Sequence, residues 1–288
     1  MDSIILVSGA TGTVGAYVVS ELAKKGLKVR AGVHTPVKTT HIKWPNVEFV
    51  QLDYGKEDTI KAAFKGVEKF YLLTPFIPEQ VEIAKLLVDS AKAAGVKYIV
   101  KQSGMGAEVE PGITVGRLHR QAEIYIEKSG IAYTFLRPNF FMQNFINFYR
   151  GTIRNESKIY LPLGDGRVSY IDARDIGSVA SEVLTREDYK GKALTLTGPE
   201  ALSAKDAAML FSKSIGRVIS YVDVPEDAAR KSMTEHGMSE WAVKCMMELH
   251  SICRAGFASN VTGTVFEVTG RRSITFEQFA KEHAEFLK

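Results

Sequence analysis

The chain has 288 residues, of which 45% are hydrophobic and 24% are charged, and its formal net charge is +4. These values are typical of an ordinary folded protein and exclude a disordered, collagen-like or coiled-coil chain. Basic residues are spread along the chain without a tract longer than pairs such as Lys24-Lys25, so the composition gives no indication of nucleic-acid binding.

The cysteine spacing and the lack of a long apolar run indicate the cellular compartment that we expect for the protein. Cys245 and Cys253 lie in one helix-like stretch, where a rise of about 1.5 Å per residue places them roughly 12 Å apart, too far for a disulfide. The N-terminus runs into an apolar segment without a charged leader, and no apolar stretch reaches the ~18 residues that span a bilayer. We therefore expect a cytoplasmic protein without a disulfide, a metal site or a membrane segment.

Short apolar runs alternate with amphipathic stretches over the first half of the chain. The runs predict strands at 4–7, 28–33, 47–52, 69–74, 98–102 and 132–137. Apolar residues at helical spacing predict helices at 14–23, 57–64, 79–94 and 115–128, several of which stop near a glycine. Strands that alternate with helices indicate right-handed βαβ crossovers and a parallel sheet.

The pattern changes after Pro138, where an aromatic-rich stretch leads into polar segments with several glycines. A helix at 176–184 and a strand at 193–197 predict a return to the sheet, and further helices are expected at 203–215, 239–255 and 275–286. Ser203 and Asp206 form a capping pattern for the first of these.

We therefore predict an α/β protein in two parts. Residues 1–150 form a Rossmann-type doubly wound parallel sheet with its helices, and residues 168–198 return to it. Residues 151–167 and 199–288 form a smaller, mostly helical C-terminal lobe that covers the substrate.

A glycine-rich turn, Ser8 to Gly15, follows the first strand and opens the first helix. A helix N-terminus offers unpaired N–H groups and the positive end of its dipole to a pyrophosphate, provided that no side chain blocks the approach. Gly9 would allow the tight turn, Gly12 the close approach and Gly15 the packing of helix on strand. A glycine-rich turn without a ligand is the simpler alternative, but its position favours dinucleotide binding. The expected cofactor contacts are Gly9, Thr11, Gly12, Thr13, Val14 and Gly15.

The glycine spacing resembles that of the short-chain dehydrogenase/reductase superfamily, and Tyr170 to Gly177 resembles the segment with which its extended members re-enter the nucleotide domain. Residues 136–145 and 196–203 are similar to the NmrA-like branch, and the resemblance covers nearly the whole chain. It implies an NAD(P)H-dependent reductase of quinones, azo dyes or triphenylmethane dyes, or a protein that binds the cofactor without turning it over.

One motif of the superfamily is missing. Its extended members carry Tyr-Gly-x-x-Lys after the fifth strand, with the tyrosine as proton donor, whereas Val115 and His119 stand at the tyrosine and lysine positions here. Ser103, which matches the superfamily's serine, and His119 are therefore the weak catalytic candidates. Reduction of an unactivated ketone is not expected, because its alkoxide needs a positioned acid, whereas an electron-poor ring needs only an aligned nicotinamide. His119 shares a helix face with Glu123, but a third metal ligand at suitable spacing is missing.

The end of the second strand favours NADP(H), with NAD(H) as the second option. The segment from His34 to Lys38 contains no acid for the ribose hydroxyls of NAD, and His34 replaces the arginine common in the resembled family, so its basic side chains favour a 2′-phosphate. By the same resemblance, Asp53 would face the adenine. The other candidates for cofactor contact are Thr74, Pro75, Phe76, Ser103, Pro138, Asn139 and Phe140.

Apolar side chains are the candidates for the substrate site, although packing in a core is the alternative for each of them. They are Met105, Phe140, Phe141, Met238 and Trp241. The predicted function is hydride transfer from NAD(P)H to a small quinone-like or other electron-poor aromatic substrate by a monomer or homodimer. The alternative is an NADP(H)-binding redox sensor that regulates a partner without turnover.

Overall fold

The structure is a computed structural model and describes residues 3–35, 44 and 46–288. The chain forms two compact units. The first unit extends as far as Arg137 and includes Ile176–Thr195, and the second contains Pro138–Asp175 and Leu196–Lys288. In the part of the chain that is described, no helix combines the length and the apolar character needed to cross a membrane.

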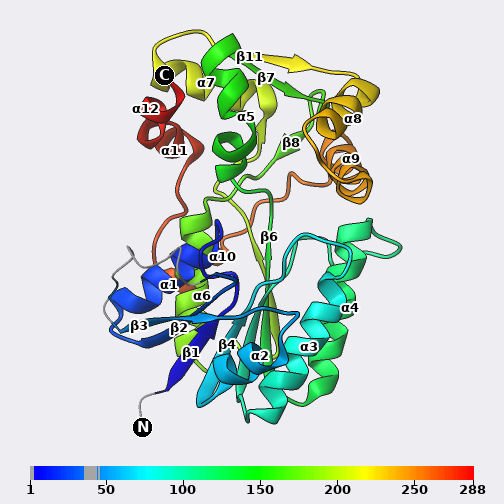
Figure 1. Cartoon of the computed structure of the whole chain (residues 1–288). Helices are drawn as coiled ribbons and strands as arrows, with labels where there is room; N and C mark the ends of the chain where they lie inside the picture. Colours follow the sequence, from blue (N-terminus) through cyan, green and yellow to red (C-terminus); the bar gives the residue numbers. More distant parts are fainter. Residues whose placement is uncertain (1–2, 36–43, 45) are drawn as a thin grey trace. The chain divides into compact units, whose positions relative to one another are not determined.

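A seven-stranded sheet forms the centre of the first unit, in the order β3-β2-β1-β4-β5-β6-β9 (Figure 1). Its strands are β1 (Ile4–Val7), β2 (Lys28–Val33), β3 (Val47–Gln51), β4 (Val67–Leu72), β5 (Tyr98–Gln102), β6 (Ala132–Pro138) and β9 (Lys192–Leu196). Neighbouring strands from β3 to β6 run parallel. The predicted doubly wound parallel sheet is thereby confirmed, with the strand order reversing at β1 and β4.

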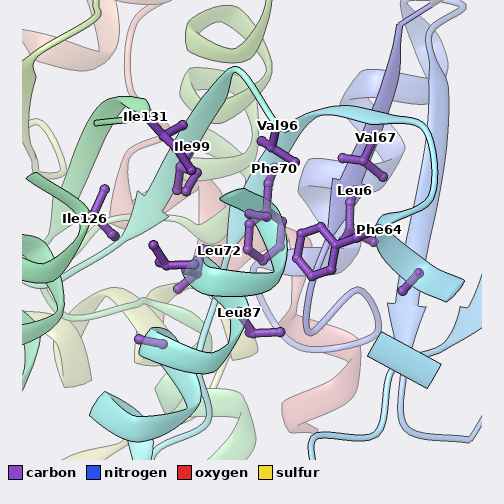
Figure 2. Packing of buried hydrophobic residues seen from close by; sticks show 14 of the residues in the cluster. Leu6, Phe64, Val67, Phe70, Leu72, Leu87, Val96, Ile99, Ile126 and Ile131 are labelled. Carbon is purple, nitrogen blue, oxygen red and sulfur yellow. The ribbon is translucent and has the colours of Figure 1, made fainter. Parts of the chain in front are cut away.

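Helices cover both faces of this sheet. On one face, α2 (Glu57–Phe64), α3 (Gln80–Ala93) and α4 (Thr114–Ser129) pack on the strands through a buried apolar cluster that includes Leu6, Phe70 and Leu87 (Figure 2). The opposite face carries α1 (Gly15–Lys24) and α6 (Ala173–Thr185) (Figure 1). The burial of strands on both faces explains why they appear in the sequence as short continuous apolar runs.

The second unit combines helices with two small sheets. In one sheet β7 (Lys158–Leu161) pairs in parallel with β11 (Ser220–Asp223), and in the other β8 (Arg167–Val168) pairs with β10 (Leu202–Ser203) in antiparallel orientation. The helices are α5 (Gln143–Glu156), α7 (Ala204–Ile215), α8 (Glu226–Glu235), α9 (Glu240–Arg254), α10 (Thr264–Thr269), α11 (Phe276–Glu282) and α12 (Ala284–Leu287). Its C-terminal part is helical, as predicted.

The region after Pro138 differs most from the prediction. The sequence pattern assigns no helix to this region, but residues 143–156 form α5, whose Phe145 and Ile153 side chains are buried. Since α5 packs against β7 and α12, the chain enters the second unit at Pro138, earlier than the expected boundary at 150.

Two local predictions for the second unit can also be compared with the structure. The predicted helix at 275–286 is divided into α11 and α12 at His283. The cap predicted at Ser203 is confirmed, because its Oγ accepts from Asp206 N at 3.1 Å and its N–H donates to the Asp206 carboxylate at 3.0 Å.

Adjacent leucines on α3 provide a test of the core. Leu87 is fully buried in the cluster of Figure 2, whereas Leu86 is 37% exposed. We expect Leu87→Ala to lower the free energy of unfolding by about 2–5 kcal/mol, because it leaves a cavity, and Leu86→Ala to lower it by less than about 1 kcal/mol. Urea unfolding followed by circular dichroism measures both variants. Equal losses would contradict the proposed packing of α3.

Candidate functional site

Glycine allows the turn after β1 to pass close beneath α1. Gly9 has φ +62°, in the left-handed region that favours glycine, and its carbonyl accepts from Gly12 N at 2.9 Å. A Cβ on Gly15 would lie 2.1 Å from the Gly9 carbonyl oxygen, far inside the contact distance of any side chain. The first turn of α1 can therefore approach β1 this closely only with glycine at position 15.

The N-terminus of α1 is suited to an anion. Its first turn has no side-chain cap and no acidic residue, and Val14 is the N-cap residue. Thr11, Gly12 and Thr13, which precede it, are exposed. The positive end of the helix dipole therefore lies next to exposed backbone. These residues fit the pyrophosphate of a dinucleotide.

Two of the predicted cofactor residues follow β2 and β3. The His34 side chain is 79% exposed, and its Nε2 lies 3.8 Å from Asp53 Oδ2; Lys56 Nζ lies 3.6 Å from the same oxygen. Asp53 Oδ1 accepts from Gly55 N at 3.0 Å, and this hydrogen bond, together with His34 and Lys56, holds the pKa of Asp53 below its usual value. Asp53 is therefore a fixed, charged acceptor at neutral pH. Lys38, the other basic candidate, lies outside the described residues.

The segment after β4 joins the same edge of the sheet. Ser8 Oγ donates to Leu73 O at 2.9 Å and accepts from Leu73 N at 2.8 Å, which ties the end of β1 to the end of β4. Thr74, Pro75 and Phe76 follow directly, and the Phe76 side chain is exposed. Because the carboxyl ends of parallel strands share one edge, the structure brings the glycine turn, the ends of β2 and β3 and this segment together.

Ser103, after β5, is held by a buried glutamate. Its Oγ donates to Glu123 Oε1 at 2.7 Å, and Arg137 donates to both carboxylate oxygens at 3.0 and 2.7 Å. Burial by itself raises the pKa of Glu123, but the hydrogen bonds from Arg137 and Ser103 outweigh it, so that the pKa lies below its usual value. The single hydroxyl proton of Ser103 is thus engaged by a charged carboxylate, which leaves this side chain to act as an acceptor.

His119, on α4, contacts a lysine that the sequence analysis did not identify. Lys101 on β5 is fully buried, its Nζ lies 3.2 Å from His119 Nδ1, and it donates to Gln102 O at 2.6 Å. Among the described residues, no carboxylate lies within 4.0 Å of Lys101 Nζ. Burial lowers the pKa of Lys101 to about 8, against the opposing influence of Glu123. Burial and the charge of Lys101 lower the pKa of His119 well below its usual value.

A signal for Lys101 was present in the sequence. Lysine is rarely fully buried, yet it stands here in a strand expected to be covered on both faces. An interior lysine at the carboxyl end of such a strand indicates a site that uses it.

The predicted residues of the second unit have mixed environments. Asn139 is buried, and its Nδ2 donates to Ser169 Oγ at 2.7 Å and to Ala258 O at 2.8 Å, so its amide supports the fold of this unit. Pro138 is buried at the end of β6, and Phe141 forms an isolated parallel β-bridge with Ile171. These residues therefore serve first to anchor the chain in the second unit.

Phe140 lines a small cavity of about 40 Å³ within the second unit, together with Phe148, Met246 and His250. Burial lowers the pKa of His250 to about 4, so the ring is neutral at neutral pH. The cavity thus has aromatic and apolar walls.

Within the second unit, Met238 and Trp241 are not among the residues that line this cavity. Met238 packs with Met233 and Val243 in a small apolar cluster of α8 and α9, which is the core alternative considered from the sequence. Trp241 lies in the first turn of α9, and Met105 follows β5 in the first unit. Among the described residues, no group of three or more His, Cys, Asp or Glu side chains is placed to hold a metal ion.

Comparisons with known proteins identify the family of the chain. Residues 1–254 match the model of the NmrA-like family. The NAD(P)H azoreductase of Xenophilus azovorans is 38% identical over 281 residues, which cover 98% of each chain. The (4-alkanoyl-5-oxo-2,5-dihydrofuran-3-yl)methyl phosphate reductase of Streptomyces griseus is 34% identical over 289 residues, again 98% of each chain.

Among solved structures, the NADPH complex of an NADPH-dependent quinone oxidoreductase from Escherichia coli has the same fold. It is 23% identical, with a TM-score of 0.86, over 96% of this chain and 99% of that one. With the family model and the azoreductase both matching along most of its length, the chain belongs to the NmrA-like family.

Proposed function

We propose that the protein is an NAD(P)H-dependent reductase that transfers hydride to azo, quinone-like or other electron-poor aromatic acceptors. The observation that carries this proposal is the close approach of Gly15 to the Gly9 carbonyl, which leaves the uncapped end of α1 accessible to a pyrophosphate. The NAD(P)H azoreductase, 38% identical over 98% of both chains, supports the type of reaction. Bound NADPH supplies the hydride.

Different residues of the first unit are assigned to different parts of the cofactor. The start of α1 would hold the pyrophosphate, and the exposed His34 after β2 would contact the 2′-phosphate of the ribose. The charged Asp53 carboxylate would accept a hydrogen bond from the adenine amino group. Thr74 to Phe76 form the adjoining wall. This division favours NADP(H), while NAD(H) lacks only the phosphate contact.

Several expectations from the sequence remain predictions. These are the cytoplasmic location, the monomeric or homodimeric state, the absence of a nucleic-acid partner, and the substrate contacts of Met105, Phe140, Phe141, Met238 and Trp241. The five substrate contacts are tested by truncating each side chain and measuring the loss of affinity for the acceptor.

Acceptor choice distinguishes the reductase from a cofactor sensor. We expect the purified protein to oxidise NADPH with an azo dye or a quinone and to fail with a simple ketone, since an electron-poor conjugated acceptor stabilises the added electron pair. NADPH oxidation is followed by absorbance against a protein-free control. If calorimetry shows that NADPH binds but no acceptor raises its oxidation above that control, the sensor is the correct function.

The glycine turn is tested by a matched pair of substitutions. Gly15→Ala places a methyl group 2.1 Å from the Gly9 oxygen and forces α1 to move, so we expect the Kd for NADPH to rise at least tenfold. Gly151→Ala, in α5, meets no atom within 4 Å and should leave the Kd unchanged. Both are measured by calorimetry after circular dichroism has verified folding. An unchanged Kd in Gly15→Ala rules out the assigned pyrophosphate site.

Cofactor preference is tested at His34. A 2′-phosphate carries nearly two negative charges, so His34→Glu removes a hydrogen-bond donor and adds repulsion. A charge-assisted hydrogen bond is worth about 1.5–3 kcal/mol, and we accordingly expect NADPH affinity to fall at least tenfold. NADH, which lacks the phosphate, is the control ligand and should lose less than about threefold at the same salt concentration. Equal losses of affinity for NADPH and NADH would show that His34 does not contact the 2′-phosphate.

A further inference from the structure

The two ring nitrogens of His119 have different surroundings. Nδ1 faces Lys101 Nζ at 3.2 Å, whereas Nε2 has no hydrogen-bond partner among the described residues. The Nε2 edge lies against Gly104, just beyond β5: a Cβ at Gly104 would be 3.1 Å from His119 Cδ2 and 3.5 Å from Nε2. The residue as a whole is half-buried, and Gly104 follows the carboxyl end of β5, at the edge where ligands of such sheets bind.

The contact with Lys101 decides which nitrogen carries the ring proton. An ammonium group donates and has no lone pair, so Nδ1 must accept. Because the pKa of His119 lies well below its usual value, the ring is neutral at neutral pH and carries its one proton on Nε2. His119 therefore presents an N–H donor at the edge of β5.

We propose that Lys101 is a positioning residue that fixes the Nε2–H form of His119 and replaces the proton that His119 gives to the anion of the reduced acceptor. This inference rests on the proposed function, and it adds an acid to a site whose tyrosine and lysine positions are occupied by Val115 and His119.

The proton steps balance for an azo acceptor. The azo bond accepts hydride at one nitrogen, and its π electron pair becomes a negative charge on the other. His119 Nε2 gives its proton to that nitrogen and keeps the electron pair, while Nδ1 takes a proton from the Lys101 ammonium. The products are a hydrazo group, NADP⁺, neutral lysine and the Nδ1–H form of histidine. Nδ1 then returns its proton to Lys101 while Nε2 takes one proton from solvent, which restores the ammonium and the Nε2–H form of the ring.

The electrostatics allow both states of Lys101. Glu123 on α4 is the charged group that acts on Lys101, and it is itself paired with Arg120 on α4 and Arg137 on β6. Glu123 favours the ammonium, but its oxygens already bond to Ser103 and the two arginines and lie outside ion-pair distance of Nζ. With a pKa of about 8, the ammonium predominates at pH 7 and the neutral amine is close in free energy.

The first test needs neither cofactor nor acceptor. In wild type we expect the ¹⁵N resonances of the His119 ring to shift with a midpoint near pH 8, as Lys101 changes from donor to acceptor. Lys101→Met should abolish that transition. It replaces a buried charge by an apolar chain of similar length, so folding is expected to persist and is verified by circular dichroism. Identical pH dependence in the two proteins would overturn the coupling of Lys101 to His119.

The second test is kinetic, at saturating NADPH. Lys101→Met and His119→Gln should each lower kcat for an azo acceptor at least tenfold with little change in KM, because a positioned acid contributes about 10²–10⁴. With a quinone, whose anion is delocalised, the loss should stay below about threefold. Wild-type kcat with the azo acceptor should decline above about pH 8, and Lys101→Met should lack that decline. The exposed Lys97→Met is the control and should match wild type.

The outcomes separate this inference from the proposed function. If wild type reduces the azo acceptor and Lys101→Met has the same kcat and pH profile, then Lys101 does not supply a proton to His119. Wild type that reduces no acceptor contradicts the proposed function and the proton supply together, and the ring-nitrogen titration still decides whether Lys101 fixes the proton on His119.

Discussion

The candidate site depends on one close approach, that of Gly15 to the carbonyl of Gly9. It determines where α1 begins relative to β1, and hence where the N–H groups of its first turn point. Ser8, one residue earlier, bonds to Leu73 and places the end of β4 beside the same turn. The other candidate groups of the first unit reach this edge because the strands run parallel and end together.

Those features were predictable because they depend on short-range patterns. Strands covered on both faces give apolar runs, helices give the 3.6-residue period, and right-handed crossovers then restrict the order of the sheet. The glycine turn and the Ser203 cap involve residues only a few positions apart. The turn requires residues without a side chain, and the cap requires a hydroxyl acceptor. Both requirements are evident from the residue types at these positions.

The features that escaped prediction are held by distant partners. The spacing of Phe145, Tyr149 and Ile153 is a local signal for α5 that was overlooked. The packing of Phe145 against Tyr170, Phe211 and Phe276 from later elements depends on tertiary contacts. Likewise, Glu123 appeared only as a helix neighbour of His119. In the structure its carboxylate instead accepts hydrogen bonds from Ser103 and Arg137, which lie at the ends of two strands. Which polar groups pair in a buried site is set by tertiary contacts, and one sequence alone does not specify them.

Lys101 shows how burial and function bear on each other. A lysine with no carboxylate at ion-pair distance among the described residues costs stability, and its hydrogen bonds to Gln102 O and His119 Nδ1 offset only part of that cost. An apolar side chain of similar volume would serve the packing of β5 on α4 at least as well. Stability therefore gives no reason for a lysine here, whereas proton chemistry does, because the same desolvation that penalises the ammonium brings its pKa toward neutrality. In the superfamily that the sequence resembles, a lysine on the helix assists the proton donor. Here the lysine comes from the strand, and a histidine stands at the helix position with one nitrogen turned toward it.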